Sequence, residues 1–245
     1  MERISEVPVS KHGMELKLRP FLIDIVTIGN GSAGRLCQLA FKTTNQRQGK
    51  SIMSRIYTIG HSNHKIEDFI QLLKMHGITA VCDVRSVPYS KHNPQFNRKS
   101  IKQNLNGVDV EYFFLGDKLG AWPDDASCYI DGIVQYDRVG KTKTFRDGLD
   151  WIKKESKNYK LALMCAEKEP VGCHRMYLVC RHIRGEFEIM HILADGKLEN
   201  NRKTERRMME DLKIPDVLTI DEIGDPVERA YVEMGKKSAH KHPKK

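Results

Sequence analysis

From Arg55 to Gly235, apolar residues follow two alternating patterns. Mostly apolar runs of six or seven residues are typical of buried strands, and longer segments with apolar residues three and four positions apart are typical of amphipathic helices. We expect strands at residues 55–60, 78–84, 110–115, 160–165 and 187–193, and helices at residues 65–77, 98–107, 129–139, 143–157, 173–185, 201–212 and 225–235.

This alternation of strands and helices predicts the fold class. A helix between two strands returns the chain to the same end of the sheet, so the strands come to lie parallel. We therefore predict a single α/β domain with three layers, in which helices cover both faces of a mostly parallel sheet. Residues 85–97 and 116–128 follow neither pattern. Their glycine, proline, asparagine and aspartate residues indicate long loops.

The pattern begins only after about fifty residues, which divides the chain into three parts. Residues 42–51 are polar and without periodicity, and Met53 comes just before the first predicted strand. We expect residues 1–52 to be an extension outside the fold, with Met53 as an alternative start, and residues 53–235 to form the α/β domain. Residues 236–245 contain lysines and no acidic residue, and we expect a flexible basic tail.

Charge and composition limit the choice of partners and compartment. The net charge of +9 comes from the two ends, because residues 53–235 hold 28 basic and 28 acidic residues. The basic pI therefore does not by itself indicate nucleic-acid binding. No stretch approaches the roughly 18 apolar residues of a membrane span, and acidic residues interrupt the region where a signal peptide would begin. We expect a cytoplasmic protein without a membrane partner, in which the six cysteines are thiols or ligands rather than disulfides.

Reactive side chains gather where the predicted strands end. In open parallel sheets, ligands bind beyond the carboxyl ends of the strands. The polar residues at or after these ends are His61, Ser62, Asp83, Arg85, Cys165, Glu167, Cys173, His174, Arg175 and His191. We predict that they share one rim of the sheet, which would be the functional site.

The first interpretation of this rim is an enzyme with a reactive thiol. Cys165 would be the nucleophile, with His61 or His174 as general base, and Asp83 and Glu167 would complete the catalytic group. A helix N-terminus and arginine side chains would stabilise the thiolate. The substrate would be an anionic small molecule, a nucleotide or a nucleic acid, held by Arg85, Arg175, Ser62, Asn93, Gln95 and Asn97.

The second interpretation is a metal site. Cys165, Cys173 and His174, together with His61 or His191, would offer the mixed sulfur and nitrogen ligands that suit zinc or iron. The adjacent positions of Cys173 and His174 are sterically awkward for two ligands of one ion, and the chain has no C-x-x-C pair. Cofactor and oligomeric state are otherwise left open by the sequence.

The third interpretation is a nucleic-acid-binding module built on residues 85–102. This segment contains five Lys/Arg residues, His92 and no acidic residue, and its aromatic residues Tyr89 and Phe96 could stack on bases. A solvated loop without such a role is the other explanation for the same composition.

Several segments together resemble the bacterial family catalogued as domain of unknown function 488. They are TIGHSN, DVRSVPYSKHNPQFN, EYFFLG, CAEKEPVGCHR, MHIL and DPVERAY. The most specific is CAE-x-x-P-x-x-CHR, which is matched by Cys165, Glu167, Pro170, Cys173, His174 and Arg175. The resemblance covers about residues 55–231 and implies a single α/β domain, but no reaction. The segment LGDKLG departs from the tighter turn that the family often has, so we expect the loop after Leu115 to differ.

Overall fold

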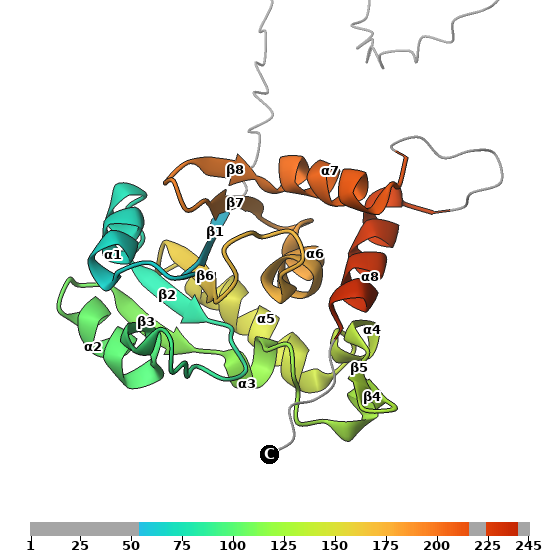
Figure 1. Ribbon diagram of the computed structural model, residues 1–245, viewed down its shortest axis with the longest axis horizontal. Helices are drawn as coiled ribbons and strands as arrows, with labels where there is room; N and C mark the ends of the chain where they lie inside the picture. Colours follow the sequence, from blue (N-terminus) through green and yellow to red (C-terminus); the bar gives the residue numbers. More distant parts are fainter. Residues whose placement is uncertain (1–53, 216–223, 240–245) are drawn as a thin grey trace, which may run out of the picture. The chain divides into compact units, whose positions relative to one another are not determined.

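The computed structural model describes residues 54–215 and 224–239, and the expected extension, residues 1–52, lies outside them. Strands and helices alternate along the described chain (Figure 1). Its first half contains β1 (Arg55–Gly60), α1 (Ile66–Met75), β2 (Ala80–Asp83), the 3₁₀ turn η1 (Pro94–Phe96), α2 (Arg98–Asn106), β3 (Glu111–Phe114), α3 (Gly116–Leu119) and the 3₁₀ turn η2 (Ala126–Cys128). Its second half contains β4 (Tyr129–Ile130), β5 (Ile133–Val134), α4 (Tyr136–Val139), α5 (Lys143–Glu155), β6 (Leu161–Cys165), the π-helical segment η3 (Arg175–Cys180), α6 (Arg181–Ile183), β7 (Glu188–Ile192), β8 (Leu198–Asn200), α7 (Asn201–Leu212) and α8 (Pro226–Ser238).

The main sheet of the described chain has six strands in the order β3-β2-β6-β1-β7-β8. All neighbouring pairs are parallel except β7 with β8. The prediction of a mostly parallel sheet is therefore confirmed.

Helices cover both faces of this sheet, because successive side chains of a strand point to opposite sides. In β1, Tyr57 and Ile59 pack against α1 and α2, whereas Ile56 faces the core that α5, η3, α7 and α8 complete. The same division runs through β2 and β6, whose residues are all buried. The three-layer α/β domain expected from the sequence is thus confirmed.

The register of the central strands places their carboxyl ends at one level. Gly60 of β1 lies opposite Cys165 of β6, and Asp83 of β2 lies opposite Met164. The connections that follow β1 and β2 lead to helices on one face, and the connection that follows β6 leads to the other face. Adjacent strands with diverging connections leave a crevice between them, which is where ligands bind in such sheets.

The helix expected at residues 129–139 is wrong over its first part. Residues 129–134 form the hairpin of β4 and β5, and only Tyr136–Val139 are helical. The turn consists of Asp131 and Gly132, which both have positive φ angles, 51° and 77°. Asp-Gly is a preferred pair for a two-residue hairpin turn, and this local preference outweighs the apolar spacing that suggested a helix.

Other elements differ from the expectation in extent. β8 was not predicted and adds an antiparallel edge strand, α3 lies in the segment expected to be a loop, and α8 continues through Ser238 into residues expected in the tail. Among the described residues, no helix is long and apolar enough to cross a membrane.

His191, on β7 between β1 and β8, is fully buried and forms hydrogen bonds with both ring nitrogens. Its Nε2–H donates to Asn201 Oδ1 at 3.0 Å, and its Nδ1 accepts from the Thr58 hydroxyl at 2.7 Å. Burial, together with the charge of Arg175, lowers the pKa of His191 to about 3. The ring is therefore neutral in the folded protein at neutral pH, and it joins β1, β7 and α7.

Acidification is expected to destabilise the fold through His191. An unfolded histidine has a pKa near 6.5, whereas the folded one titrates near 3. Between these values the unfolded state binds more protons, so stability falls as the pH is lowered, by up to about 1.4 kcal/mol per unit. Urea unfolding at about pH 7 and about pH 4.5 measures this loss.

The variant His191→Gln should be less stable than the wild type at neutral pH but should lose less stability on acidification. Replacing the exposed His92 by Gln is the control and should leave the wild-type pH dependence in place. If His191→Gln lost as much stability as the wild type on acidification, the titration would have to be assigned to another group.

Candidate functional site

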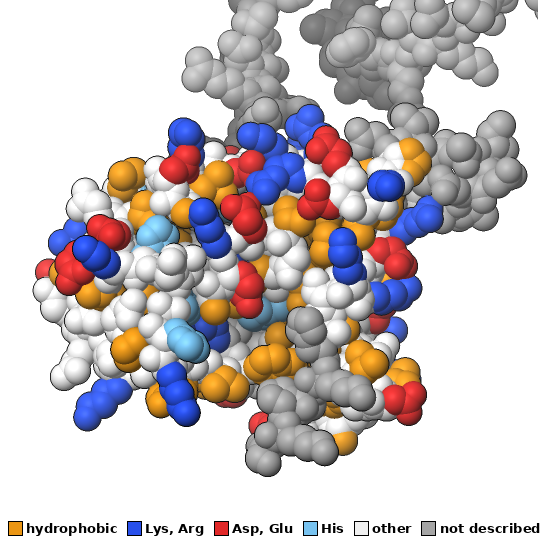
Figure 2. Space-filling model, in the orientation of Figure 1, with side chains coloured by type: hydrophobic (Ala, Val, Ile, Leu, Met, Phe, Trp, Pro, Cys, Tyr) orange, Lys and Arg blue, Asp and Glu red, His pale blue; other side chains and the backbone are white. Residues whose placement is uncertain are grey.

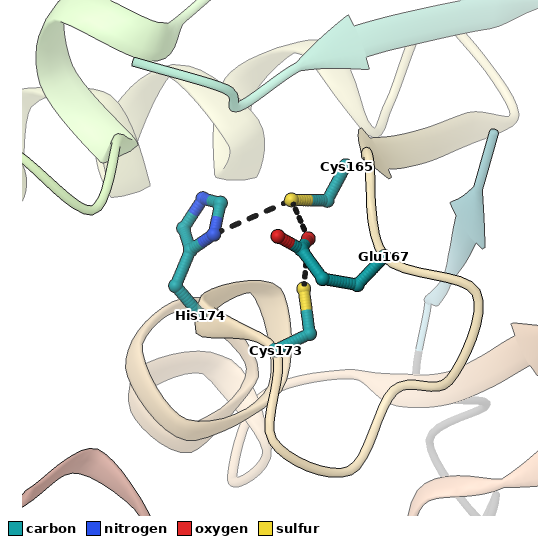
Figure 3. A group of neighbouring side chains, drawn as sticks. All are labelled: Cys165, Glu167, Cys173 and His174. Carbon is teal, nitrogen blue, oxygen red and sulfur yellow. Dashed lines mark hydrogen bonds between the residues drawn. The ribbon is translucent and has the colours of Figure 1, made fainter. Parts of the chain in front are cut away.

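Four side chains at the end of β6 form a compact group, which we call the thiol cluster: Cys165, Glu167, Cys173 and His174 (Figure 3). Each residue offers one potential ligand atom, a sulfur, an imidazole nitrogen or a carboxylate oxygen, and these four atoms all lie within 4.8 Å of one another. The Cys165 and Cys173 thiols both donate to Glu167 Oε2, with sulfur–oxygen distances of 2.6 and 3.1 Å. Cys165 Sγ also lies 3.3 Å from His174 Nδ1. The two thiols, the carboxylate and the imidazole thus converge on one point.

The sheet decides the course of the loop that carries Glu167. After Cys165 the chain stays beside β1, since the backbone N–H groups of residues 61 and 62 donate to the carbonyls of residues 165 and 166, both at 2.9 Å. The glycine at position 60 permits this approach, because a Cβ added to Gly60 would overlap with the carbonyl group of Glu167. A larger residue at this position would push the Glu167 loop away from the sheet.

The adjacent residues Cys173 and His174 both reach the cluster because they lie where the loop turns into a helix. Neighbouring side chains in a helical conformation project about 100° apart, so they can approach one point from two directions. The His174 ring is oriented by its Nε2–H, which donates to the carbonyl of Val84 at 2.9 Å and leaves Nδ1 directed at Cys165. The π-helical η3 follows at once, and such segments are frequent at functional sites.

Arg175 binds the backbone of the loop that carries Glu167. Its side chain is 1% exposed, and it donates to the carbonyls of Glu167 and Lys168 at 2.6 and 3.1 Å. Its Nη1 also lies 3.5 Å from Cys173 Sγ. This arginine therefore fixes the backbone of the loop and places a positive charge beside one of the two thiols.

The surroundings of the two thiols give them different pKa values. Burial by itself raises the pKa of both thiols, but the hydrogen bond with Cys165 and the charge of Arg175 lower that of Cys173 to about 6. For Cys165, burial and the neighbouring negative groups raise the pKa well above its ordinary value. Glu167, despite the effect of burial, has its pKa lowered to about 2 by the Cys165 thiol and the charge of His174. Of the two thiols, Cys173 is thus the more acidic.

The proton on His174 follows from these contacts. The single thiol proton of Cys165 cannot serve both Glu167 and His174, so either Nδ1 accepts this proton or a protonated Nδ1 donates to the sulfur. Burial by itself lowers the pKa of His174, but the interactions with Cys173 and Glu167 raise it above its ordinary value. The second arrangement, with an imidazolium donating to the Cys165 sulfur, is therefore favoured.

A second group, which we call the arginine cluster, consists of His61, Asp83, Arg85 and Tyr112. Arg85 donates to both carboxylate oxygens of Asp83, at 2.9 and 2.6 Å, and Tyr112 donates to Asp83 Oδ2 at 2.7 Å. Arg85 also donates to the Phe96 carbonyl at 2.8 Å and, through Nη1, to His61 Nε2 at 2.9 Å. Burial, and next the charge of Arg85, lower the pKa of His61 to about 4. The lone pair of His61 Nε2 thus accepts the hydrogen bond from Arg85.

A pocket of about 520 Å³ lies beside both clusters. Cys165, Glu167 and His174 line it from the thiol cluster, and Arg85 lines it from the arginine cluster. Cys165 is 2% exposed but is one of the lining residues, whereas Cys173 is not. Glu167 is the exposed member of the thiol cluster, and the other three are buried. A small molecule in this pocket would therefore meet Glu167 first, with Cys165 and His174 behind it.

Comparison with known proteins identifies one family. The family described as Domain of unknown function DUF488 matches residues 65–181. The chain resembles this family. The DUF488 match includes all of the thiol cluster, but it begins after TIGHSN and ends before MHIL and DPVERAY, so the wider range of residues 55–231 stays a prediction. No match was found among curated proteins or among solved structures.

The structure brings together most of the polar residues that the sequence placed at the rim. His61, Asp83, Arg85, Cys165, Glu167, Cys173, His174 and Arg175 belong to the two clusters or support them. His191 lies elsewhere, in its network with Thr58 and Asn201. Among the described residues, the group suited to a metal therefore contains Glu167 in the place that the sequence analysis gave to His61 or His191.

The residues expected to bind an anion have partners within the protein. Asn97 Oδ1 accepts from the N–H of Ser90 at 2.6 Å, and Gln95 donates to the carbonyl of His64 at 2.9 Å. Ser62 and Asn93 also make contacts close to them in sequence. Arg85 and Arg175 are buried and form the hydrogen bonds described above. Anion binding by these residues stays a prediction, and none of the four uncharged residues lines the pocket.

The basic segment 85–102 surrounds η1 and the start of α2. Arg85 belongs to the arginine cluster, whereas Lys91, Arg98, Lys99 and Lys102 are exposed. Figure 2 shows Lys and Arg side chains interspersed with Asp and Glu over the face in view, which is consistent with the balanced charge of residues 53–235. Binding of nucleic acid by this segment stays a prediction.

Sequence reasoning missed the aromatic residues of the site. Tyr112 completes the arginine cluster from β3, and Trp122, Tyr136 and Tyr177 line the pocket from three further segments. No local motif distinguishes them from core aromatics. The loop position of Trp122 was the one available signal, since functional residues are frequent on long loops.

Replacing Asp83 by Asn should destabilise the protein by about 3–5 kcal/mol, because the buried charge of Arg85 would lose its partner. The matched control is Asp147→Asn, which breaks the exposed pair with Lys143 at the same distance of 2.6 Å. We expect little change in that variant, since exposed ion pairs contribute little to stability. Urea unfolding measures both, and equal losses would contradict a stabilising role of the arginine cluster.

Proposed function

We propose that the thiol cluster binds one divalent transition-metal ion, zinc or ferrous iron, and that the protein is a metal-dependent enzyme. The observation that carries the proposal is the convergence of two sulfur atoms, one imidazole nitrogen and one carboxylate oxygen within 4.8 Å beside a pocket. Thiolate and imidazole ligands suit zinc and iron and are poor ligands for magnesium or calcium.

The separations within the cluster support this reading. With metal–ligand bonds of about 2.0–2.3 Å, the ligand atoms of a tetrahedral site lie roughly 3.3–3.8 Å apart. The contacts of Cys165 with His174 and of Cys173 with Glu167, 3.3 and 3.1 Å, are close to that range, and the 2.6 Å contact of Cys165 with Glu167 would have to lengthen. The ion would replace the protons that these four groups now share, so only small side-chain movements would be needed.

The surroundings of the cluster also suit a metal site. Histidine ligands commonly donate their second ring N–H to a carbonyl, as His174 does to Val84. Arg175 donates toward the Cys173 sulfur, and such hydrogen bonds stabilise thiolate ligands. His174 and Cys173 are thus oriented by groups that are not ligands themselves.

Exposure suggests separate roles for the four residues. Cys165, Cys173 and His174 are buried and would be the permanent ligands. Glu167 is exposed and lines the pocket, so we propose that it occupies the fourth position or acts as general acid and base when a water molecule binds there. Three protein ligands with one exchangeable position are typical of catalytic rather than structural zinc sites.

Metal analysis of protein purified without a histidine tag tests the proposal. We expect about one zinc or iron ion per chain. Cys165→Ser, Cys173→Ser and His174→Gln should each retain much less metal, and Co²⁺ added to the metal-free wild type should give the charge-transfer absorption of thiolate ligands. Cys180→Ala is the control, because this buried thiol ends η3, the helix that follows the cluster residues Cys173 and His174, and lies outside the cluster. A wild type without stoichiometric metal, and without thermal stabilisation by added zinc, would contradict the proposal.

A reactive thiol is the second candidate function, and the contact between Cys165 and His174 favours it. The Cys165 thiol can pass its proton to Glu167 at 2.6 Å, and the His174 imidazolium, 3.3 Å from the sulfur, would stabilise the thiolate that forms at the pocket. Cys165 would attack the substrate, and Arg175 beside Cys173 would stabilise negative charge in the cluster. This reading requires a metal-free cluster.

Alkylation of the metal-free protein by iodoacetamide, followed by peptide mass spectrometry, tests the second candidate. Cys165 should react faster than the core thiol of Cys82, and His174→Gln should slow its reaction about 10-fold or more by removing the positive charge beside the thiolate. Protection by zinc would favour the metal site instead. Equal rates for Cys165 and Cys82 would exclude an activated thiol.

A further inference from the structure

Aromatic side chains form much of the pocket beside the thiol cluster. Tyr89, Trp122, Tyr136 and Tyr177 contribute to its lining from four different segments of the chain. Its volume of about 520 Å³ lies within the range that is usual for small-molecule sites. We propose that this pocket binds an uncharged, planar heteroaromatic ring of nucleobase size as the substrate of the metal centre. The substrate role rests on the proposed function, whereas binding of the ring does not.

The indole of Trp122 supplies the first argument. Its Nε1–H is buried and has no acceptor among the described residues. Buried N–H groups almost always have a partner, because leaving one unsatisfied is costly. Trp122 lines the pocket, and in this proposal its N–H is the donor to a ring nitrogen or carbonyl oxygen of the bound ligand. A purely hydrocarbon ring could not accept this hydrogen bond.

Tyr136 and Tyr177 supply the second argument. Their rings lie 5.0 Å apart at 53°, and Tyr177 donates its hydroxyl proton to the Tyr136 oxygen at 3.4 Å. This arrangement leaves the Tyr136 hydroxyl proton for a ligand. Tyr89 is 62% exposed, so its ring is accessible to a ligand in the pocket. Aromatic faces bind planar rings by stacking, and bases are the common biological case.

The position of Trp122 is fixed before any ligand binds. Its backbone N–H donates to Ser86 Oγ at 2.9 Å, which joins the loop after α3 to the loop after β2. A Cβ added to Gly120 would overlap with Ser86, so the close approach of these two loops requires glycine. A wall held in this way binds a rigid ring with little loss of conformational entropy.

The charges of the pocket favour an uncharged ring over a small anion. Arg85 is the arginine of the lining, and its charge is paired with Asp83 at 2.6 Å. Three of its five N–H groups point at Asp83 and the Phe96 carbonyl, and a fourth points at His61. Glu167 adds a carboxylate to the same lining. Within the part of the chain that the structure describes, the lining thus offers an anion no unpaired cation.

Calorimetric titration of the full chain, as purified, tests the inference. The probes are adenine and uracil, with 5,6-dihydrouracil as the saturated match of uracil and inorganic phosphate as a small anion. We expect at least one of the two bases to bind, and dihydrouracil and phosphate to bind much more weakly. Trp122→Phe keeps the aromatic ring but removes the N–H, and it should weaken binding about 10-fold, the effect of one hydrogen bond.

Trp151→Phe is the matched control, because the second tryptophan packs against Phe113, outside the pocket lining, and its replacement should leave affinity unchanged. Failure of both bases to bind, equal binding of uracil and dihydrouracil, binding of phosphate alone, or equal effects of the two tryptophan variants would overturn the inference. Metal content is measured on the same samples. If protein without metal bound a base and Trp122→Phe weakened this binding, the ring site would be supported and the metal centre contradicted. Failure of the ring site and failure of the metal centre are therefore distinguishable.

Discussion

The parallel pairing of β6 with β1 and β2 is the constraint on which the rest of the structure depends. It sets Cys165 opposite Gly60 and Met164 opposite Asp83, so three connections leave the sheet at one level. Hydrogen bonds from residues 61 and 62 to the carbonyls of residues 165 and 166 extend the pairing beyond β6. Because a glycine stands at the end of β1, the loop that carries Glu167 can cross it in direct contact.

Two buried guanidinium groups fix the positions of these loops by hydrogen bonds. Arg175 donates to two carbonyls of the loop after β6, and Arg85 joins the end of β2 to His61 and to η1. Each charge is buried, so each needs the partners it has. The polar groups around the pocket are therefore held at set distances in the folded protein, which is the condition for selective binding or catalysis.

The thiol cluster is held together by this scaffold more than by attraction among its members. Two thiols and a carboxylate at such short range would repel one another if all three were ionised. The pKa of Cys165 is raised because the thiol is buried and because of this repulsion. A divalent ion would remove that repulsion by binding all four groups at once. The aromatic wall of the pocket stands beside the same four groups, so a bound ring and the proposed ion would be neighbours.

By itself, the sequence determined the alternating α/β architecture, because buried strands and amphipathic helices have distinct apolar spacings. It also indicated which strand ends carry reactive residues, and the segment around Cys165 identified the family resemblance. Only the tertiary structure decided that Glu167, rather than His191, completes the group around the thiols, and that Trp122 faces the same pocket. The physical reason is that spacing along a chain fixes which face of an element a residue occupies. The partners of that residue depend on register, loop course and burial, which arise only when distant segments pack.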